Sequence, residues 1–132
     1  MEERAPDFAE RTSTHVAGAI VVMGGWAAFA NRAHGGAASF RAGLVQALVS
    51  AVVTFTLKTA LEAMTSRRRG VAAFVVPPLV ICSAVLGLLV TAHRLAGTRE
   101  LWSTIAIPYA ASSAYAWISL FILARRRAAS GQ

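Results

Sequence analysis

Residues 71–92 read VAAFVVPPLVICSAVLGLLVTA, and they contain no Asp, Glu, Lys or Arg. An α-helix rises about 1.5 Å per residue, so about 20 apolar residues cross a hydrocarbon core of about 30 Å. This stretch therefore has the length and the composition of a membrane-spanning helix. Residues 101–124 are also free of charge, and residues 16–30 and 43–57 form two shorter apolar blocks.

The composition of the chain agrees with a membrane protein. Of the 132 residues, 56% are hydrophobic, whereas soluble domains contain about 45–50% apolar residues even with glycine counted. We predict an all-α membrane protein with four transmembrane helices in an antiparallel bundle, because the intervening loops are short. The whole chain, 1–132, is expected to form this single domain, with approximate spans at 13–30, 43–64, 71–92 and 101–124.

The first span is the shortest, and it has an alternative interpretation. Its apolar part, 16–30, must be extended by Thr12–His15. The hydroxyls of Thr12, Ser13 and Thr14 are suitable helix caps. The sequence AFA at 28–30 fits the cleavage pattern of a signal peptide. However, the preceding segment MEERAPDFAER carries four acids, which is the wrong sign of charge for the start of a signal peptide. We therefore expect the first span to be retained.

The arginines predict the orientation. With four spans, eight arginines lie in the two tails and the second loop, and the remaining four lie in the first and third loops. Positive charge is enriched on the cytoplasmic side of membrane proteins. We therefore expect a multi-pass protein of the inner (cytoplasmic) membrane of a bacterium, with both termini in the cytoplasm.

Two arginine triplets lie directly beside apolar spans. Such triplets attract anionic headgroups, at about 1 kcal/mol per residue near the surface. A nucleic-acid partner is not expected, because the basic clusters are not interleaved with aromatic residues. The predicted lipid-contacting residues are Arg67, Arg68, Arg69, Arg125, Arg126 and Arg127.

A polar side chain recurs at every fourth position of the second span, at Gln46, Ser50, Thr54, Lys58 and Glu62. Four residues turn a helix by about 400°, so each polar residue is displaced by about 40° from the last. One straight polar track through the membrane is therefore not expected. Lys58 and Glu62 lie near the expected cytoplasmic end, where they form either an interfacial pair or a transport site.

A row of small residues runs beside the first three members of this polar ladder, Gln46, Ser50 and Thr54. Small residues at four-residue spacing let two helices approach closely, and neighbouring hydroxyl or amide groups then bond across the gap. The contact partner is either a neighbouring helix or another chain. The predicted helix-packing residues are Gly43, Ala47 and Ala51 on the second span, with Ser83 and Gly87 on the third.

No cofactor or metal site is expected. The single cysteine, Cys82, excludes a cysteine-rich metal site. His34 and His93 are expected on one side of the membrane and His15 on the other, without a supporting cluster of carboxylates. We also expect no enzyme, since the sequence contains no recognisable nucleophile and base pair or phosphate-binding loop.

The short chain with four predicted spans resembles small multidrug-type transporters in its size. That resemblance implies an acid within the first helix, but VAGAIVVMGGWAAFA at 16–30 contains none. The basic ending ARRRAASGQ is similar to that of phage holins, although many membrane proteins share this feature. We expect an accessory or assembly protein that acts through contacts with lipids and with other membrane proteins or copies of itself. The alternative is a small oligomeric transporter or channel that uses the polar ladder.

Overall fold

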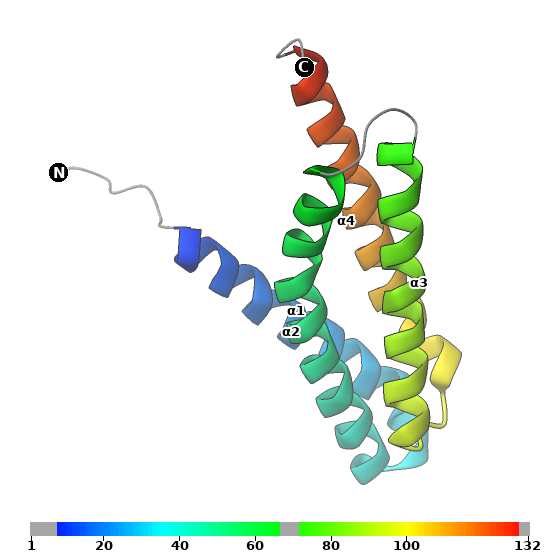
Figure 1. The fold of residues 1–132 in the computed structure, drawn as a ribbon. Coiled ribbons are helices and arrows are strands. Elements are labelled where there is room, and N and C mark those ends of the chain that lie inside the picture. Colours follow the sequence, from blue (N-terminus) through cyan, green and yellow to red (C-terminus); the bar gives the residue numbers. More distant parts are fainter. Residues whose placement is uncertain (1–7, 67–71, 130–132) are drawn as a thin grey trace, which may run out of the picture.

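The described part of the chain folds into four α-helices. The computed structural model describes residues 8–66 and 72–129, and this part of the chain contains no strand. Figure 1 shows how the helices are arranged. The elements are α1 (Phe8–Ala30), a 3₁₀ turn η1 (Arg32–His34), α2 (Gly36–Ser66), α3 (Ala72–Leu95) and α4 (Leu101–Ala129). The prediction of an all-α chain with four helices is confirmed.

Three of the four helices are long and apolar enough to cross a membrane. Their apolar segments are Gly36–Leu57 in α2, Val75–Leu95 in α3 and Leu101–Ile122 in α4. The apolar segment of α1, Val16–Ala30, is shorter than a spanning length. Length and composition therefore support three of the four predicted spans.

The connection between α1 and α2 is much tighter than the predicted loop from 31 to 42. α2 begins at Gly36 rather than at residue 43. Gly35 has a φ of 90°, a conformation that glycine adopts without the strain of a Cβ atom, and it reverses the chain after η1. The Ser39 hydroxyl then donates a hydrogen bond to the carbonyl of Ala28, at 2.6 Å. This bond fixes the first turn of α2 against the end of α1.

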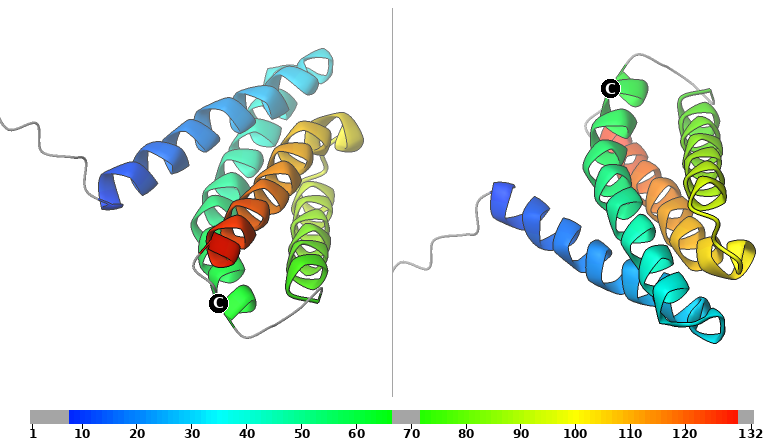
Figure 2. Two further views of the ribbon diagram at one scale, coloured as in Figure 1. Left: turned by 90° about the horizontal axis from the view of Figure 1, so that it is seen from above. Right: turned by 90° about the horizontal axis from the view of Figure 1, so that it is seen from below.

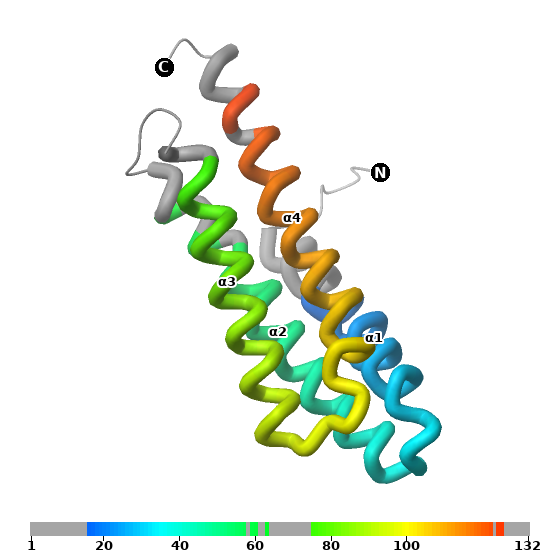
Figure 3. Tube along the Cα trace, turned by 90° about the vertical axis from the view of Figure 1, so that its right-hand side faces the viewer, coloured from blue at the N-terminus to red at the C-terminus, as the bar shows by residue number. Residues whose placement is uncertain are grey.

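α2, α3 and α4 lie side by side (Figures 1 and 3). Side chains of these three helices form the hydrophobic core. The C-terminal ends of α2 and α4 and the N-terminal end of α3 lie at the top of Figure 1. Many core residues recur at four-residue intervals, which places them on one side of each helix. They are Val49, Val53 and Leu57 of α2, Ile81, Val85 and Leu89 of α3, and Ile105 and Ala116 of α4.

α1 is arranged differently from the other three helices. Its C-terminal half packs on α2, and its N-terminal half leaves the other helices at a steep angle (Figure 2). Val21 and Val22 are consequently exposed. The departure of α1 means that the three long apolar helices carry most of the core.

The outward sides of the long helices are covered by large apolar side chains. A soluble protein rarely exposes a continuous surface of this kind, whereas lipid tails or other apolar helices cover it without cost. On α2 these residues are Phe40, Leu44, Leu48, Val52 and Phe55, and α4 exposes Trp102, Ile107, Ile118, Phe121 and Ile122. The surface is compatible with a membrane protein.

Candidate functional site

The most distinctive site is a cluster of hydrogen-bonded polar residues at the end where α2 and α4 begin and α1 and α3 end. We call this cluster the polar clasp. It contains all five buried polar residues of the part that the structure describes, namely Asn31, Gln46, Ser50, His93 and Thr104. It also includes His34, Thr98 and Glu100, which bond to these residues or to one another.

One half of the polar clasp joins α2 to α3. Gln46 donates from Nε2 to the Ser50 hydroxyl at 2.9 Å, and its Oε1 lies 2.9 Å from Nε2 of His93. The other ring nitrogen of His93, Nδ1, lies 2.9 Å from the Thr98 hydroxyl. Because the Gln46 Oε1 only accepts hydrogen bonds, this arrangement requires the proton on Nε2 of His93. The amide and the imidazole thus satisfy each other in a region without water contact.

The other half joins the end of α1 to the start of α4. The Asn31 amide donates to the carbonyl of Ala27 at 2.9 Å and to the Thr104 hydroxyl at 2.8 Å. Its Oδ1 accepts the backbone N–H of Glu100 at 3.2 Å. The Thr104 hydroxyl in turn donates to the carbonyl of Glu100. The Asn31 side chain therefore links the end of α1 to the beginning of α4.

Two further contacts hold the connections at this end. His34 Nε2 lies 2.9 Å from Glu100 Oε1, and both side chains are partly exposed. The indole N–H of Trp26 donates to the carbonyl of Ser103 at 3.0 Å. η1, α1 and the segment leading into α4 are therefore held together by charged and aromatic side chains as well as by the buried amides.

The chemistry of the polar clasp favours a structural role. A buried donor or acceptor that loses its partner costs about 1–3 kcal/mol, so a fully bonded cluster fixes one arrangement of the helix ends. Gln46 and His93 bond to each other and to the hydroxyls of Ser50 and Thr98. Asn31 uses its amide on the Thr104 hydroxyl and on the backbone. Within residues 8–66 and 72–129, no group of three or more His, Cys, Asp or Glu residues could hold a metal ion.

The structure brings together only part of the predicted polar ladder. Gln46 and Ser50 are buried and bonded to each other, and Thr54 is partly buried. The side chains of Lys58 and Glu62 lie outside the described part. The ladder therefore contributes two members, Gln46 and Ser50, to the polar clasp. The two alternatives for Lys58 and Glu62, an interfacial pair or a transport site, stay predictions.

Gly43 and Ala47 lie where α1 crosses α2. A Cβ atom added to Gly43 would be 3.0 Å from the Gly24 carbonyl oxygen and 3.1 Å from the Ala28 Cβ. A Cβ atom added to Gly24 would meet the Gly43 carbonyl oxygen at 3.0 Å and the Ala47 Cβ at 3.2 Å. The two helices therefore meet through reciprocal pairs of small residues at four-residue spacing, as close helix packing requires.

The remaining predicted packing residues are placed differently. Ala51 is partly buried, whereas Ser83 and Gly87 are exposed on α3. A Cβ atom added to Gly87 would have no neighbouring atom within 4 Å. Ser83 and Gly87 therefore do not mediate close packing between helices of the same chain, because the core side of α3 is formed by Ile81, Val85 and Leu89.

Only one of the predicted lipid-contacting arginines has a described side chain. Its guanidinium carbon, in Arg125, lies 4.6 Å from the centre of the Phe121 ring, near the end of α4. Arg67, Arg68 and Arg69 lie outside the described residues, as do the side chains of Arg126 and Arg127. Lipid contact at this end stays a prediction.

Sequence reasoning did not identify Asn31, His93 and Thr104 as members of one site. His34 and His93 were expected on the same side of the membrane without a ligand, and they do lie at the same end of the molecule. The available signal was the position of each polar residue at an end of an apolar block. Pairing them requires the tertiary arrangement, since the bonded residues are up to 73 positions apart. No protein-family model matches this chain, and no curated protein or solved structure shows significant similarity to it.

Proposed function

We propose that this chain is a multi-pass integral membrane protein that acts as an accessory or assembly protein through helix and lipid contacts. The observation that carries the proposal is the distribution of side chains on α2, α3 and α4. Their outward surfaces are large and apolar, whereas the buried polar side chains are hydrogen-bonded to one another at one end. Lipids and apolar helices are the partners that such a surface fits.

The proposal includes four membrane crossings in an antiparallel bundle. α1 has 23 residues, which correspond to about 35 Å of helix, so its polar first turns can complete the crossing that its apolar part begins. Four crossings put both termini on one side. The excess of arginines in the tails and the second loop favours the cytoplasm for that side, and the bacterial inner membrane is the proposed location.

A contact role is favoured over transport by the way in which Gln46 is bonded. Both polar atoms of its amide are used within the chain, by Ser50 and by His93. A residue that binds a passing substrate needs a free donor or acceptor on the route of that substrate. The proposal therefore assigns Gln46 and Ser50 to holding α2 and α3 together.

Copurification in mild detergent tests the proposal. The full chain should copurify with a second polypeptide, either another membrane protein or a further copy of itself. Gly87→Leu adds bulk to the exposed small surface of α3 and should reduce this association if the surface contacts a partner. Val52→Leu is the matched control, because Val52 is also exposed but belongs to the large apolar surface of α2.

A monomeric protein with transport activity would be the opposite outcome. A protein that stays monomeric in several mild detergents, and that moves a substrate across the membrane of liposomes, would contradict the accessory role. The transporter or channel alternative would then be favoured.

A further inference from the structure

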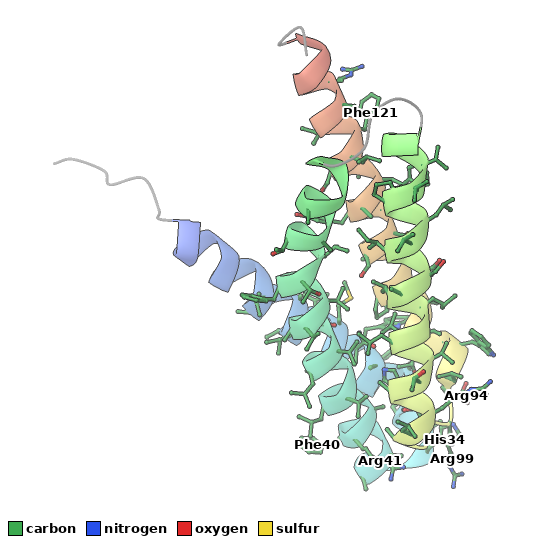
Figure 4. All side chains as sticks on the ribbon, in the orientation of Figure 1. His34, Phe40, Arg41, Arg94, Arg99 and Phe121 are labelled. Carbon is green, nitrogen blue, oxygen red and sulfur yellow. The ribbon has the colours of Figure 1, made fainter. Side chains whose placement is uncertain are left out.

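Three arginine side chains at the polar-clasp end have no partner among the residues that the structure describes. Arg41 belongs to α2, Arg94 lies in the last turn of α3, and Arg99 lies in the connection to α4. All three are exposed, and Figure 4 shows them at the same end of the molecule. Within residues 8–66 and 72–129, none of them forms a hydrogen bond or an ion pair.

The fold brings these arginines to one turn. Nη2 of Arg41 lies 3.8 Å from the position that a Cβ atom on Gly97 would take. The backbone N–H of Gly97 donates to the carbonyl of Arg94 at 3.0 Å, and Arg99 follows two residues later. The guanidinium of Arg41 therefore lies over a turn that carries Arg94 on one flank and Arg99 on the other.

The acidic residues in the connections at this end are too few to neutralise the three arginines. Glu100 is the only acid in residues 31–42 and 93–100, and its Oε1 already lies 2.9 Å from His34. Arg32, the fourth arginine of these segments, donates to the carbonyl of Phe29 and lies 3.8 Å above the Phe29 ring. Arg41, Arg94 and Arg99 thus remain as three unneutralised donors of bidentate hydrogen bonds.

Exposed aromatic residues flank the arginines. Phe40 is 71% exposed and precedes Arg41, and Trp102 is 66% exposed and lies three residues after Arg99. Tryptophan is enriched at the membrane–water interface, where its amphipathic ring lies at the level of the lipid headgroups. The apolar segment of α3 ends at Leu95 and that of α4 begins at Leu101, so the turn between them lies at the same level.

We propose that Arg41, Arg94 and Arg99 together bind the phosphate of an anionic phospholipid headgroup. A guanidinium matches the geometry of a phosphate with two parallel hydrogen bonds, and it retains its charge at all physiological pH values. This site is separate from the arginine triplets at residues 67–69 and 125–127. It rests on the proposed function in one respect, since it requires that the helices span a membrane.

Tryptophan quenching by brominated lipids tests this site in the full chain. In a Trp117→Phe background, Trp26 and Trp102 remain, and both lie at the polar-clasp end. Vesicles of phosphatidylcholine receive increasing fractions of brominated phosphatidylglycerol or brominated phosphatidylcholine. The anionic lipid should quench with about fivefold or greater preference at low salt, since each arginine near the surface contributes about that factor.

Removing the three charges should abolish the preference. The triple variant Arg41→Gln, Arg94→Gln, Arg99→Gln should be quenched equally by the two lipids, and the corresponding lysine variant should keep part of the preference. If the triple variant does not insert, Arg99→Gln alone, in an exposed connection, should lower the preference. Unchanged preference in the glutamine variants would overturn the proposal.

Two controls separate this site from general charge attraction. The variant Arg67→Gln, Arg68→Gln, Arg69→Gln removes the same charge from another loop and should keep the preference; an equal loss would overturn the site. Inorganic phosphate shares the chemistry of the headgroup and should weaken the preference more than chloride at the same ionic strength, but millimolar phosphate should not abolish it, because the lipid is held next to the site by the bilayer. Complete loss of the preference in millimolar phosphate would assign the site to free phosphate and contradict a lipid ligand. Insertion into vesicles without lipid preference would refute only this inference, whereas failure to insert would also refute the proposed function.

Discussion

Nε2 of His93 lies 2.9 Å from Oε1 of Gln46, so the last turns of α3 are hydrogen-bonded to α2 across 47 positions of the sequence. Both side chains are fully buried. When this bond is broken, neither side chain can form a hydrogen bond with water instead. Each residue therefore stabilises the fold only while the other is present. The ends of α2 and α3 are therefore coupled through this bond.

Replacing one partner of this pair should destabilise the protein by about 1–2 kcal/mol. Gln46→Met and His93→Phe each leave the other residue with an unsatisfied buried atom. Thermal unfolding in a mild detergent measures the effect. The double variant should lose less than the sum of the two single losses, because neither partner of this bond remains to be left unsatisfied. Additive losses would mean that the bond does not couple the two helices.

Adding a methyl group at the crossing of α1 and α2 should be costly. Gly24→Ala would place a Cβ atom 3.0 Å from the Gly43 carbonyl oxygen, and overpacking of this kind typically costs about 1–3 kcal/mol. Gly25→Ala is the matched control, since a Cβ atom there has no neighbour within 4 Å. Alanine also favours helix over glycine, so this control should be neutral or slightly stabilising. Equal unfolding temperatures for the two variants would argue against the close crossing.

Substitutions in the other half of the polar clasp should differ in size. Asn31→Ala removes three hydrogen bonds and leaves the Thr104 hydroxyl and the Glu100 N–H short of partners. Glu100→Gln keeps a hydrogen-bonding partner for His34 in a partly exposed contact, and such contacts contribute less than about 1 kcal/mol. Unfolding measurements should rank Asn31→Ala as clearly more destabilising. The reverse order would show that the exposed pair holds this end of the fold.

Lys58→Met and Glu62→Gln should leave folding and complex formation mostly intact. Their position near the predicted cytoplasmic end of α2 favours an interfacial anchoring role. Copurification yield and unfolding temperature measure the two properties. A transport or leak activity in liposomes that either change abolishes would instead assign the pair to a substrate route.

The sequence was sufficient to predict the helices but insufficient to predict their ends. Charge-free blocks such as 71–92 mark apolar helices directly, because length and hydrophobicity are properties of a continuous segment. The early start of α2 depended on the Gly35 turn and on the bond from Ser39 to Ala28, which no hydrophobicity pattern contains. The predicted loop was therefore too long.

The candidate site was only partly predictable for a related reason. Gly43 and Ala47 stand out by their spacing, but their complement on α1, Gly24 and Ala28, is recognised only when the two helices are seen to cross. Ser83 and Gly87 have the same four-residue spacing, and yet both are exposed. Spacing identifies a row on one side of a helix, and the tertiary fold decides what that side contacts.

Labelling with a membrane-impermeant maleimide measures directly whether the chain crosses the membrane four times. In a Cys82→Ser background, single cysteines are introduced at Ala5, Leu95 and Ser130, and Leu95 is suitable because it is 84% exposed at the end of α3. Four crossings with cytoplasmic termini predict that intact cells are labelled only at position 95, and that all three positions react after the membrane is permeabilised. Labelling of one terminus but not the other from outside, or recovery of the protein in the soluble fraction, would contradict the account.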